Sequence, residues 1–405
     1  MVDHLNSEGP GGPLSGIRVL DLTINVLGPV ATQLLGDMGA DVIKIEPPQG
    51  DPMRESGQGR NPGMSAFFLN MNRNKRSVVL DLKDHDGREA LLRLIAGADV
   101  LVHAMRPRAA ERLGIDYDSL KAENPRLIHA SAPGYDPDGP FRDRPAYDDV
   151  IQGESGLADM VRLATGTPGY LPTVSVDKTC GVYLAMAISM TLYNRERTGK
   201  GQQVQIPMLE SMLSFNLIEH LCSGTFDDAG GIGYARALST HRKPYKTKDG
   251  YICLLAVNDD QWKRLLIALK RADVINEPKY STITERTRNI NDLYATVAEA
   301  VEQFSSAHLH QALTEADIPH GPMNRLVELL DNEYLQQTGF FRRYEHPSEG
   351  LVVTTEIPQR FSGTPARIRL APPRLGEHTE QVLREVGCSA AVIAKIMGPC
   401  SKAQH

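Results

Sequence analysis

Short apolar runs alternate with helical stretches over residues 17–132, and this alternation constrains the fold more than any other feature of the chain. Runs typical of buried strands cover residues 17–23, 41–46, 76–82, 99–105 and 126–132, and helical stretches include residues 28–40 and 87–98. Strands of about six residues that alternate with helices of about a dozen predict an α/β fold with a doubly wound parallel sheet. A sheet of this kind binds its ligands beyond the carboxyl ends of its strands.

The turn after the first strand, TINVLGPVATQLLGDMG, lacks the glycine patterns that bind nucleotides. Gly28, Gly36 and Gly39 are not spaced as in G-x-G-x-x-G, and the chain contains no P-loop. The sheet is therefore expected to be Rossmann-like without a nicotinamide or ATP site. A non-catalytic or nicotinamide-binding Rossmann protein is the alternative from a different class, and the missing fingerprint argues against it.

The bulk composition indicates a globular protein and excludes some partners. The chain has 405 residues, 41% of them apolar and 23% charged, and a net charge of −6. The mild acidity argues against nucleic acid and against a membrane surface as partners. Residues 180–193, the longest apolar stretch, are too few to span a bilayer.

Cysteine and histidine usage points to the cytoplasm and away from metal chemistry. The five cysteines are scattered without C-x-x-C spacing, as reduced thiols are. The first residues do not form a secretory signal, and we expect them to be disordered. Because the twelve histidines form no H-E-x-x-H motif, no metal site is expected.

The second half of the chain predicts a smaller domain. Helical segments near residues 262–270, 291–304 and 306–316 follow the strand-like YICLLAV, which suggests an α+β domain. Strands are expected in EGLVVTTEIPQRFSGTP, and two helices in LGEHTEQVLREVGCSAAVIAKI. The expected division is a large domain over 13–205, a linker over 206–243, a small domain over 244–330, and a return to the large domain over 331–397.

One carboxylate, Asp177, stands out in the stretch LPTVSVDKTCG. A strand-like run precedes it, and a long apolar segment of helical length follows. An aspartate at such a junction usually caps the helix. It can also act as a nucleophile that forms covalent intermediates.

Two basic clusters lie close to predicted strand ends. Either they form a solvated face, or they attract an anionic ligand such as a polyphosphate. Their members are Arg73, Lys75, Arg76 and Lys83 in the first cluster, and Arg106, Arg108 and Arg112 in the second.

Several blocks together resemble the class III CoA-transferases, the family of formyl-CoA transferase and of the carnitine and bile-acid CoA-transferases. The resemblance runs from about residue 13 to residue 397. The blocks occur in the family's order: PLSGIRVLDLT, GPVATQLLGDMGADVIKIEPPQGDPMR, NRNKRSVVLDLK, YDDVIQGESGLA, NRERTGKGQQV and LGEHTEQVL.

The resemblance implies that Asp177 is the catalytic nucleophile. In the family this aspartate attacks an acyl-CoA thioester, giving a mixed anhydride and then an aspartyl-CoA thioester, from which CoA passes to a second carboxylic acid. No permanently bound cofactor is implied, because CoA esters are the substrates. Oxyanion donors are expected at the helix start after Asp177 and in the loop around Gly230, Gly231 and Gly233. The implied CoA-binding residues are Val26, Leu27, Leu80, Lys83, Ala104, Met105, Arg106, Arg112 and Arg144.

The chain departs from formyl-CoA transferase at positions that bear on the acid. That enzyme has Arg where this chain has Pro47, and Asn-Phe-Gly at 104–106, and its run of four glycines is replaced here by DDAGGIGYARALSTHRKPY. Formyl or oxalyl specificity is therefore not expected. A dicarboxylate is expected as the acceptor instead, with succinyl-CoA as the donor. The expected substrate residues are Gly231, Arg236, His241 and Arg242.

The related α-methylacyl-CoA racemases provide the alternative within the superfamily. They move an α-proton with a histidine, and Tyr147 of AYDDVI stands at the matching position. A phenol, with an ordinary pKa of about 10, is a poor base at neutral pH, which favours the transferase. The resemblance also implies a homodimer of two interlocked chains.

Overall fold

The computed structural model describes residues 11–226 and 231–398. The chain divides into two compact units. The first contains residues 1–151, 173–212 and 334–405, and the second contains residues 152–172 and 213–333. The first ten residues, expected to be disordered, lie outside the described part.

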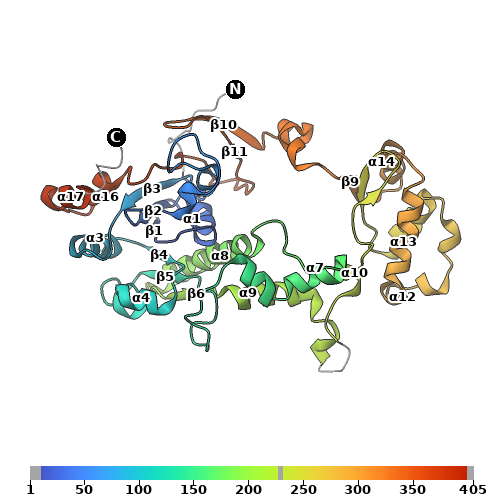
Figure 1. Ribbon diagram of the computed structural model, residues 1–405, viewed down its shortest axis with the longest axis horizontal. Coiled ribbons are helices and arrows are strands. Elements are labelled where there is room, and N and C mark those ends of the chain that lie inside the picture. Colours follow the sequence, from blue (N-terminus) through green and yellow to red (C-terminus); the bar gives the residue numbers. More distant parts are fainter. Residues whose placement is uncertain (1–10, 227–230, 399–405) are drawn as a thin grey trace. The chain divides into compact units, whose positions relative to one another are not determined.

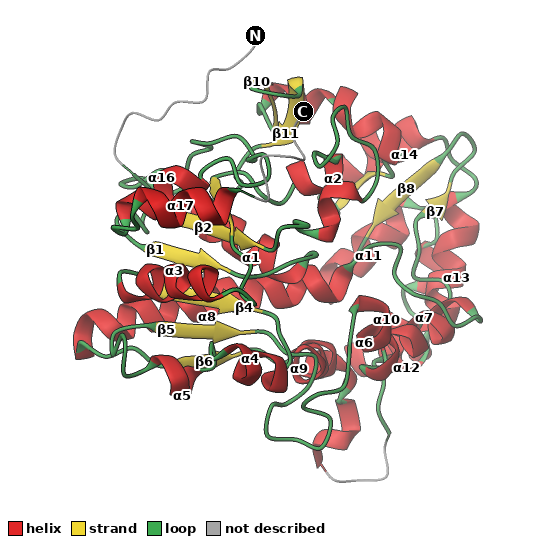
Figure 2. Ribbon diagram, turned by 60° about the vertical axis from the view of Figure 1, so that its left-hand side comes forward, coloured by secondary structure: helices red, strands yellow, loops and turns green. Residues whose placement is uncertain are grey.

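A six-stranded parallel sheet forms the centre of the first unit (Figures 1 and 2). The strand order 3-2-1-4-5-6 is that of the Rossmann fold, and the sheet is parallel and doubly wound, as the alternation predicted. The strands are β3 (Lys75–Val79), β2 (Asp41–Glu46), β1 (Arg18–Asp21), β4 (Val100–His103), β5 (Ile128–Ser131) and β6 (Gln203–Gln205).

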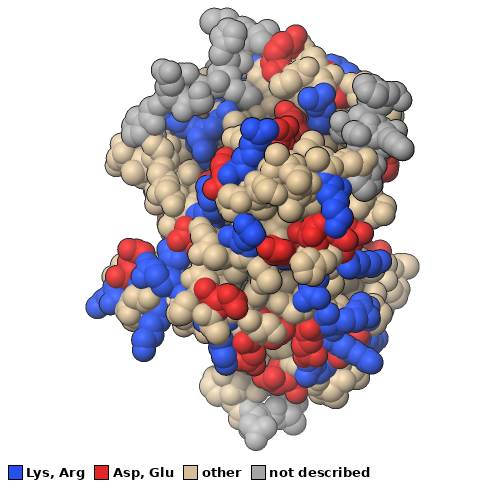
Figure 3. All heavy atoms as spheres, turned by 90° about the vertical axis from the view of Figure 1, so that its left-hand side faces the viewer, with Lys and Arg blue, Asp and Glu red and all other residues tan. Residues whose placement is uncertain are grey.

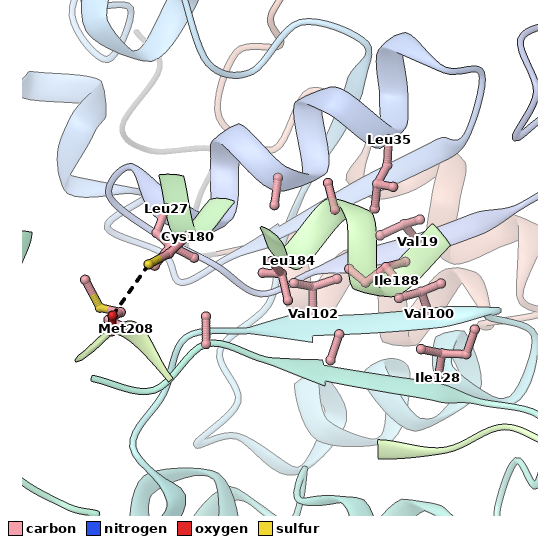
Figure 4. Close-up of a cluster of buried hydrophobic side chains, with 14 of the residues drawn as sticks. Val19, Leu27, Leu35, Val100, Val102, Ile128, Cys180, Leu184, Ile188 and Met208 are labelled. Carbon is pink, nitrogen blue, oxygen red and sulfur yellow. Dashed lines mark hydrogen bonds between the residues drawn. The ribbon is translucent and has the colours of Figure 1, made fainter. Parts of the chain in front are cut away.

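Side chains alternate along these strands and form a hydrophobic core on each face of the sheet. On one face, Val19 and Val102 pack with α1 (Leu27–Asp37) and α8 (Ser175–Thr198). Figure 4 shows Cys180, Leu184 and Ile188 of α8 inserted between α1 and the strands.

The opposite face is covered by several shorter helices. Leu20 and Leu101 pack there with α3 (His85–Ala96). Of the terminal helices, α16 (Thr379–Glu385) contacts β3 and α17 (Ala390–Met397) contacts α3 (Figure 1). The connection from β4 to β5 forms α4 (Pro107–Leu113) and α5 (Tyr117–Leu120). The β5–β6 connection includes α6 (Asp148–Glu154), and α9 (Met208–His220) follows β6.

Further elements of the first unit lie outside the sheet. A short helix, α2 (Ala66–Leu69), precedes β3, and β10 (Phe341–His346) pairs in antiparallel with β11 (Gly350–Thr355). Strand β11 confirms the first part of the prediction for EGLVVTTEIPQRFSGTP, whereas residues 356–365 form no strand. Strand β10, FRRYEH, was not predicted, because arginines and a glutamate interrupt its apolar pattern.

The second unit has its own core, as the α+β pattern predicted. A three-stranded antiparallel sheet packs with a group of helices around buried Trp262 and Leu293. Its strands are β7 (Tyr245–Lys246), β8 (Tyr251–Leu254) and β9 (His320–Pro322). Its helices include α7 (Leu157–Thr165), α10 (Ala235–Leu238), α11 (Asp259–Ala268), α12 (Ile283–Arg288), α13 (Ile290–Val301) and α14 (Ser306–Glu315). Helix α15 (Glu333–Gln337) begins at the last residue of this unit.

The surface carries charges of both signs. On the face shown in Figure 3, basic and acidic side chains are interspersed. Many such charges are paired within a helix, as Arg93 is with Glu89 in α3 and Arg384 with Glu380 in α16. None of the helices in residues 11–226 and 231–398 is long and apolar enough to cross a membrane.

Candidate active site

A cavity of about 500 Å³ opens at the carboxyl ends of the parallel strands in the first unit. Residues that directly follow or end β1, β2, β3, β4 and β5 line it, which is where a sheet of this topology binds its ligand. We call it the strand-end cavity. Its walls include Leu22, Ile24, Asn25, Ile45, Pro47, Leu80, Lys83, Ala104, Met105, Arg106, Ala132, Arg144, Tyr147, Asp177 and Met208.

Asp177 lies in the first turn of α8 and not at the end of a strand. The expected strand before it is wrong: residues 171–174 form no strand, and the helix begins at Ser175, directly after Val174. Helix is favoured because Val176, although β-branched, is fully buried in the core that α8 shares with α1 and the sheet.

The start of α8 is fixed by a second acid. Asp148, at the start of α6, accepts a hydrogen bond from the backbone N–H of Asp177 at 3.0 Å. Asp148 therefore satisfies one of the free N–H groups of α8 and leaves the Asp177 side chain in the cavity wall.

The environment of Asp177 opposes its negative charge. Burial, and then the nearby carboxylates of Asp148 and Asp149, raise the pKa of Asp177 to about 7. A helix N-terminus alone would lower the pKa of a carboxyl group. Burial and the two acids outweigh it, so Asp177 gains and loses its proton near neutral pH.

A thiol close to Asp177 is held inert. Cys180 is fully buried one turn further along α8, with its Sγ 3.8 Å from the carbonyl oxygen of Met208 (Figure 4). Burial, together with Asp177 and Asp148, raises the pKa of this thiol to about 12. Cys180 is thus neutral at ordinary pH and is no competing nucleophile.

Buried ion pairs position the loop that follows β1. Lys44 donates to the carbonyl oxygen of Thr23 at 2.8 Å and pairs with Asp51 at 2.9 Å, with both charged side chains fully buried. Asp51 also accepts from the backbone N–H of Asn25, which adopts a left-handed conformation with φ of 65°. Because Ile24 and Asn25 line the strand-end cavity, this network determines the shape of one wall.

The structure corrects the expectation for the first basic cluster. Arg73 pairs with Asp37, Lys75 with Asp21 and Arg76 with Asp41 and Glu385, at distances of 2.7–3.1 Å. These three cations therefore stabilise the fold at β3 and its amino end, and they are neither a solvated face nor an anion site. Of this cluster, only Lys83 lines the strand-end cavity.

Most of the residues implied for CoA come together around Asp177. Leu27, Leu80, Lys83, Ala104, Met105, Arg106 and Arg144 line the same cavity. Val26 is buried and Arg112 is exposed on α4, and neither lines the cavity. Asp148 and Asn25 were missed, although the acid pair in AYDDVI was a signal that the sequence contained.

The predicted substrate residues belong to the second unit, and the predicted oxyanion donors include backbone amides at the start of α8. Gly231, Gly233, Arg236, His241 and Arg242 belong to the second unit and stay predictions, and Gly230 lies outside the described residues. The N–H of Lys178, directly after Asp177, donates to the carbonyl oxygen of Val174 at 3.4 Å. That amide is engaged in the helix, and the oxyanion donors stay a prediction.

The fold and the cavity define an α/β protein with a desolvated carboxylate at the ligand edge of a Rossmann-like sheet. Residues 14–379 match the model of CoA-transferase family III. The chain belongs to this family, and it is a family III CoA-transferase, whose substrates are CoA thioesters.

Named relatives and solved structures agree with this assignment. The chain is 31% identical to the succinate–glutarate CoA-transferase of Agrobacterium fabrum, with 92% of this chain and 96% of the relative covered. It is also 31% identical to a formyl-CoA:oxalate CoA-transferase of Rhodopseudomonas palustris, with 92% of this chain and 93% of the relative covered. A CAIB/BAIF family protein from Brucella suis has a TM-score of 0.77 and 29% identity, over 93% of this chain and all of that one.

Proposed function

We propose that the chain transfers CoA from an acyl-CoA thioester to a free carboxylic acid through covalent intermediates on Asp177. The observation that carries this proposal is the placement of the Asp177 carboxylate in the strand-end cavity, together with seven residues implied for CoA. A carboxylate in this setting can act as a nucleophile toward a thioester.

The proposed first half-reaction transfers CoA to the enzyme. An oxygen of Asp177 attacks the thioester carbonyl carbon, the C–S bond breaks, and CoA leaves as a thiolate with the bonding electrons. The product is a mixed anhydride. The thiolate then attacks the Asp177 carbonyl carbon, and the C–O bond breaks to release the donor acid as a carboxylate.

The second half-reaction reverses these steps with another acid. Its carboxylate attacks the aspartyl thioester and expels the thiolate, which then attacks the acyl carbon of the new anhydride. The Asp177 carboxylate is regenerated, and the new CoA ester leaves. Overall, one CoA thioester and one free carboxylate are exchanged for another thioester and another carboxylate, so no external energy source is needed.

The proposed acceptor is a dicarboxylate, with succinyl-CoA as the donor. The relative from Agrobacterium fabrum is named for succinate and glutarate, which supports this choice. In the second unit, Arg236 is engaged, because its Nε donates to the Tyr294 hydroxyl at 2.9 Å and its Nη2 donates to the Ala256 carbonyl at 3.0 Å. Arg242 is exposed and is the better candidate to bind the second carboxylate of the acid.

The proposed assembly is a homodimer in the cytoplasm. Four apolar side chains, Val182, Met186, Met190 and Tyr193, form a stripe along α8 and are 45–66% exposed. Apolar stripes of this kind usually mark protein interfaces, and a second copy is the partner that the family resemblance implies. Cys180, Cys222, Cys253 and Cys388 are free thiols, which suits a reducing compartment.

Replacement of the nucleophile tests the mechanism. Asp177→Ala should abolish CoA exchange between succinyl-CoA and glutarate while leaving CoA-ester binding intact, as measured by calorimetry. During turnover, hydroxylamine should modify Asp177 in the wild-type enzyme, which mass spectrometry of peptides detects. If the alanine variant keeps its exchange rate, or if the label falls on another residue, the covalent mechanism is wrong.

A further inference from the structure

Asp51 joins two loops at the ligand edge of the parallel sheet. It lies in the loop after β2, and its side chain reaches the turn after β1 (residues 22–26), which we call the β1–α1 turn. Its Oδ1 accepts from the backbone N–H of Asn25 at 3.2 Å and from that of Met53 at 3.0 Å. Its Oδ2 pairs with Nζ of Lys44 at 2.9 Å. One carboxylate therefore connects both loops and strand β2.

The β1–α1 turn has little freedom to change its shape. Thr23 donates its backbone N–H to Asp21 at 2.9 Å, and its carbonyl oxygen accepts from Nζ of Lys44 at 2.8 Å. The chain also passes close to itself, because a Cβ at Gly28 would lie 2.1 Å from the Cβ of Thr23. Asn25 has a φ of 65°, a left-handed conformation that most side chains disfavour and that asparagine tolerates better.

This turn forms one wall of the strand-end cavity. Leu22, Ile24 and Asn25 line the cavity, and so does Leu27, the first residue of α1. Ile24 is 41% exposed, so a ligand in the cavity can reach its side chain. Asp177 lies in the wall of the same cavity, and CoA thioesters are the substrates of this family. A change in the shape of the turn would therefore change the surface that a CoA ester contacts.

The Lys44–Asp51 ion pair that holds the turn is fully buried. Burial alone would lower the pKa of Lys44, but nearby carboxylates, foremost Asp21 and Asp51, raise it above its ordinary value, so Lys44 stays charged. Glu46 accepts from the backbone N–H of Asp51 at 3.0 Å and so holds this residue from the other side. Hydrophobic residues of similar volume often stabilise a fold as well as a buried ion pair does, so stability does not by itself explain the pair.

A second buried ion pair in the first unit provides a comparison. Asp37 pairs with Arg73 at 2.8 Å, and neither residue lines the strand-end cavity. By contrast, Asn25 and Glu46, which form hydrogen bonds with Asp51, both line it. The two pairs are alike in their burial, and they differ in the part of the molecule that they hold.

We propose that Asp51 is a positioning residue for the CoA ester, because it holds the β1–α1 turn in the shape to which the ester binds. Asp51 is 1% exposed and acts through the backbone N–H of Asn25. Because this wall is already ordered in the free enzyme, binding causes little loss of conformational freedom there. The inference rests on the proposed function in one respect, namely that the CoA ester binds in the strand-end cavity.

Calorimetry with succinyl-CoA tests the proposal in variants that also contain Asp177→Ala, so that no transfer occurs. Asp51→Ala should raise the Kd at least about tenfold, a difference of about 1.4 kcal/mol. Asp51→Asn keeps an oxygen that can accept from the N–H of Asn25, and it should recover most of this affinity. Asp37→Ala is the matched control, which should lower the melting temperature and leave the Kd unchanged. An unchanged Kd in Asp51→Ala, or an equal rise in Asp37→Ala, would overturn the proposal.

Two substitutions of Asn25 test the backbone conformation directly, and they decide the matter where Asp51→Ala does not fold. Glycine adopts a positive φ freely and alanine does not, and both lack the amide side chain. Asn25→Ala should therefore have a Kd for succinyl-CoA about fivefold higher than Asn25→Gly. Equal Kd values would show that the shape of the turn does not limit binding.

Steady-state kinetics in enzyme that retains Asp177 separates this inference from the proposed function. Asp51→Ala should raise KM for succinyl-CoA and keep kcat within about twofold, because binding is weakened and the chemistry is not. If wild type exchanges CoA between succinyl-CoA and glutarate while Asp51→Ala has the same KM, only the positioning role is wrong. A wild type that neither exchanges CoA nor binds succinyl-CoA would reject the proposed function and this inference together.

Discussion

Asp177 is the residue whose ionisation sets the proposed chemistry. The nucleophile is the carboxylate, and the pKa of Asp177 is raised to about 7 by burial, Asp148 and Asp149. The fraction of active enzyme should therefore rise with pH and reach its plateau above about pH 8. The dependence of kcat/KM on pH measures this midpoint for the free enzyme.

A variant that removes one neighbouring charge should shift that profile. Asp148→Asn keeps an oxygen that can accept from the N–H of Asp177, but it removes a negative charge that raises the pKa of Asp177. We expect the midpoint of kcat/KM to fall toward lower pH by about one unit, the size of effect that a close like charge has. Asp118→Asn, on the exposed α5, is the control and should leave the midpoint unchanged. A midpoint that stays in place in Asp148→Asn would show that Asp148 does not act on Asp177 through its charge.

The same raised pKa makes a prediction about stability. Between the ordinary pKa of 3.8 and about 7, the folded protein holds a proton on Asp177 that the unfolded chain has released. The free energy of unfolding therefore falls as pH rises through this window and is constant above it. Asp177→Asn removes the effect, so its stability relative to wild type should increase between pH 4 and pH 7.

Chemical denaturation measures that difference. One pKa unit corresponds to about 1.4 kcal/mol, and because water reaches this half-buried side chain, we expect a gain of about 2 kcal/mol at pH 8. At pH 4, Asp177→Asn and wild type should be equally stable. A gain that is the same at both pH values would come from packing and not from ionisation.

At the scale of elements, the loop that follows α10 contains the proposed acid-binding cation. Arg242→Ala should raise KM for glutarate about tenfold, the loss of roughly 1.4 kcal/mol, and leave KM for succinyl-CoA nearly unchanged. Arg236→Ala is the matched comparison, because the hydrogen bonds of Arg236 to Tyr294 and Ala256 make it part of the second unit's structure. It should lower the melting temperature more than Arg242→Ala does. Equal changes in both KM values, or none, would show that Arg242 does not bind the acid.

Regular elements with a strong apolar period were predictable from the sequence. The parallel sheet, α3, α13 and the terminal helices agree with the prediction because each buries a face that its own residues define. The prediction of a strand before Asp177 was wrong, because the burial of Val176 in the core around α8 overrides the strand preference of this β-branched residue.

Parts of the site depend on contacts between distant residues, and spacing in the sequence cannot reveal those. The acids that neutralise Arg73, Lys75 and Arg76 lie 35 to 54 residues away on other strands and helices, apart from Glu385. The cap from Asp148 to α8 likewise joins residues 29 apart. The position of the strand-end cavity was predictable from topology, but the pKa of Asp177 was not.

At the scale of the whole molecule, the apolar stripe on α8 predicts how the chain associates. Val182, Met186, Met190 and Tyr193 recur every three or four residues and so lie along one side of the helix. Met190 and Tyr193 are 62% and 66% exposed, which is unfavourable for apolar groups in water. Burial of this stripe against a second copy would remove that cost, and obligate interfaces are typically rich in such side chains.

Light scattering distinguishes a dimer from a monomer. Wild type at low micromolar concentration should have twice the chain mass of 44.5 kDa. Met186→Lys combined with Met190→Lys places two charges in the stripe, and it should give monomer or insoluble protein, because a charge buried without a partner is strongly unfavourable. Asn194→Lys adds a charge on the same helix outside the stripe and should remain dimeric. A monomeric wild type would reject the dimer, and a dimeric double variant would move the interface away from α8.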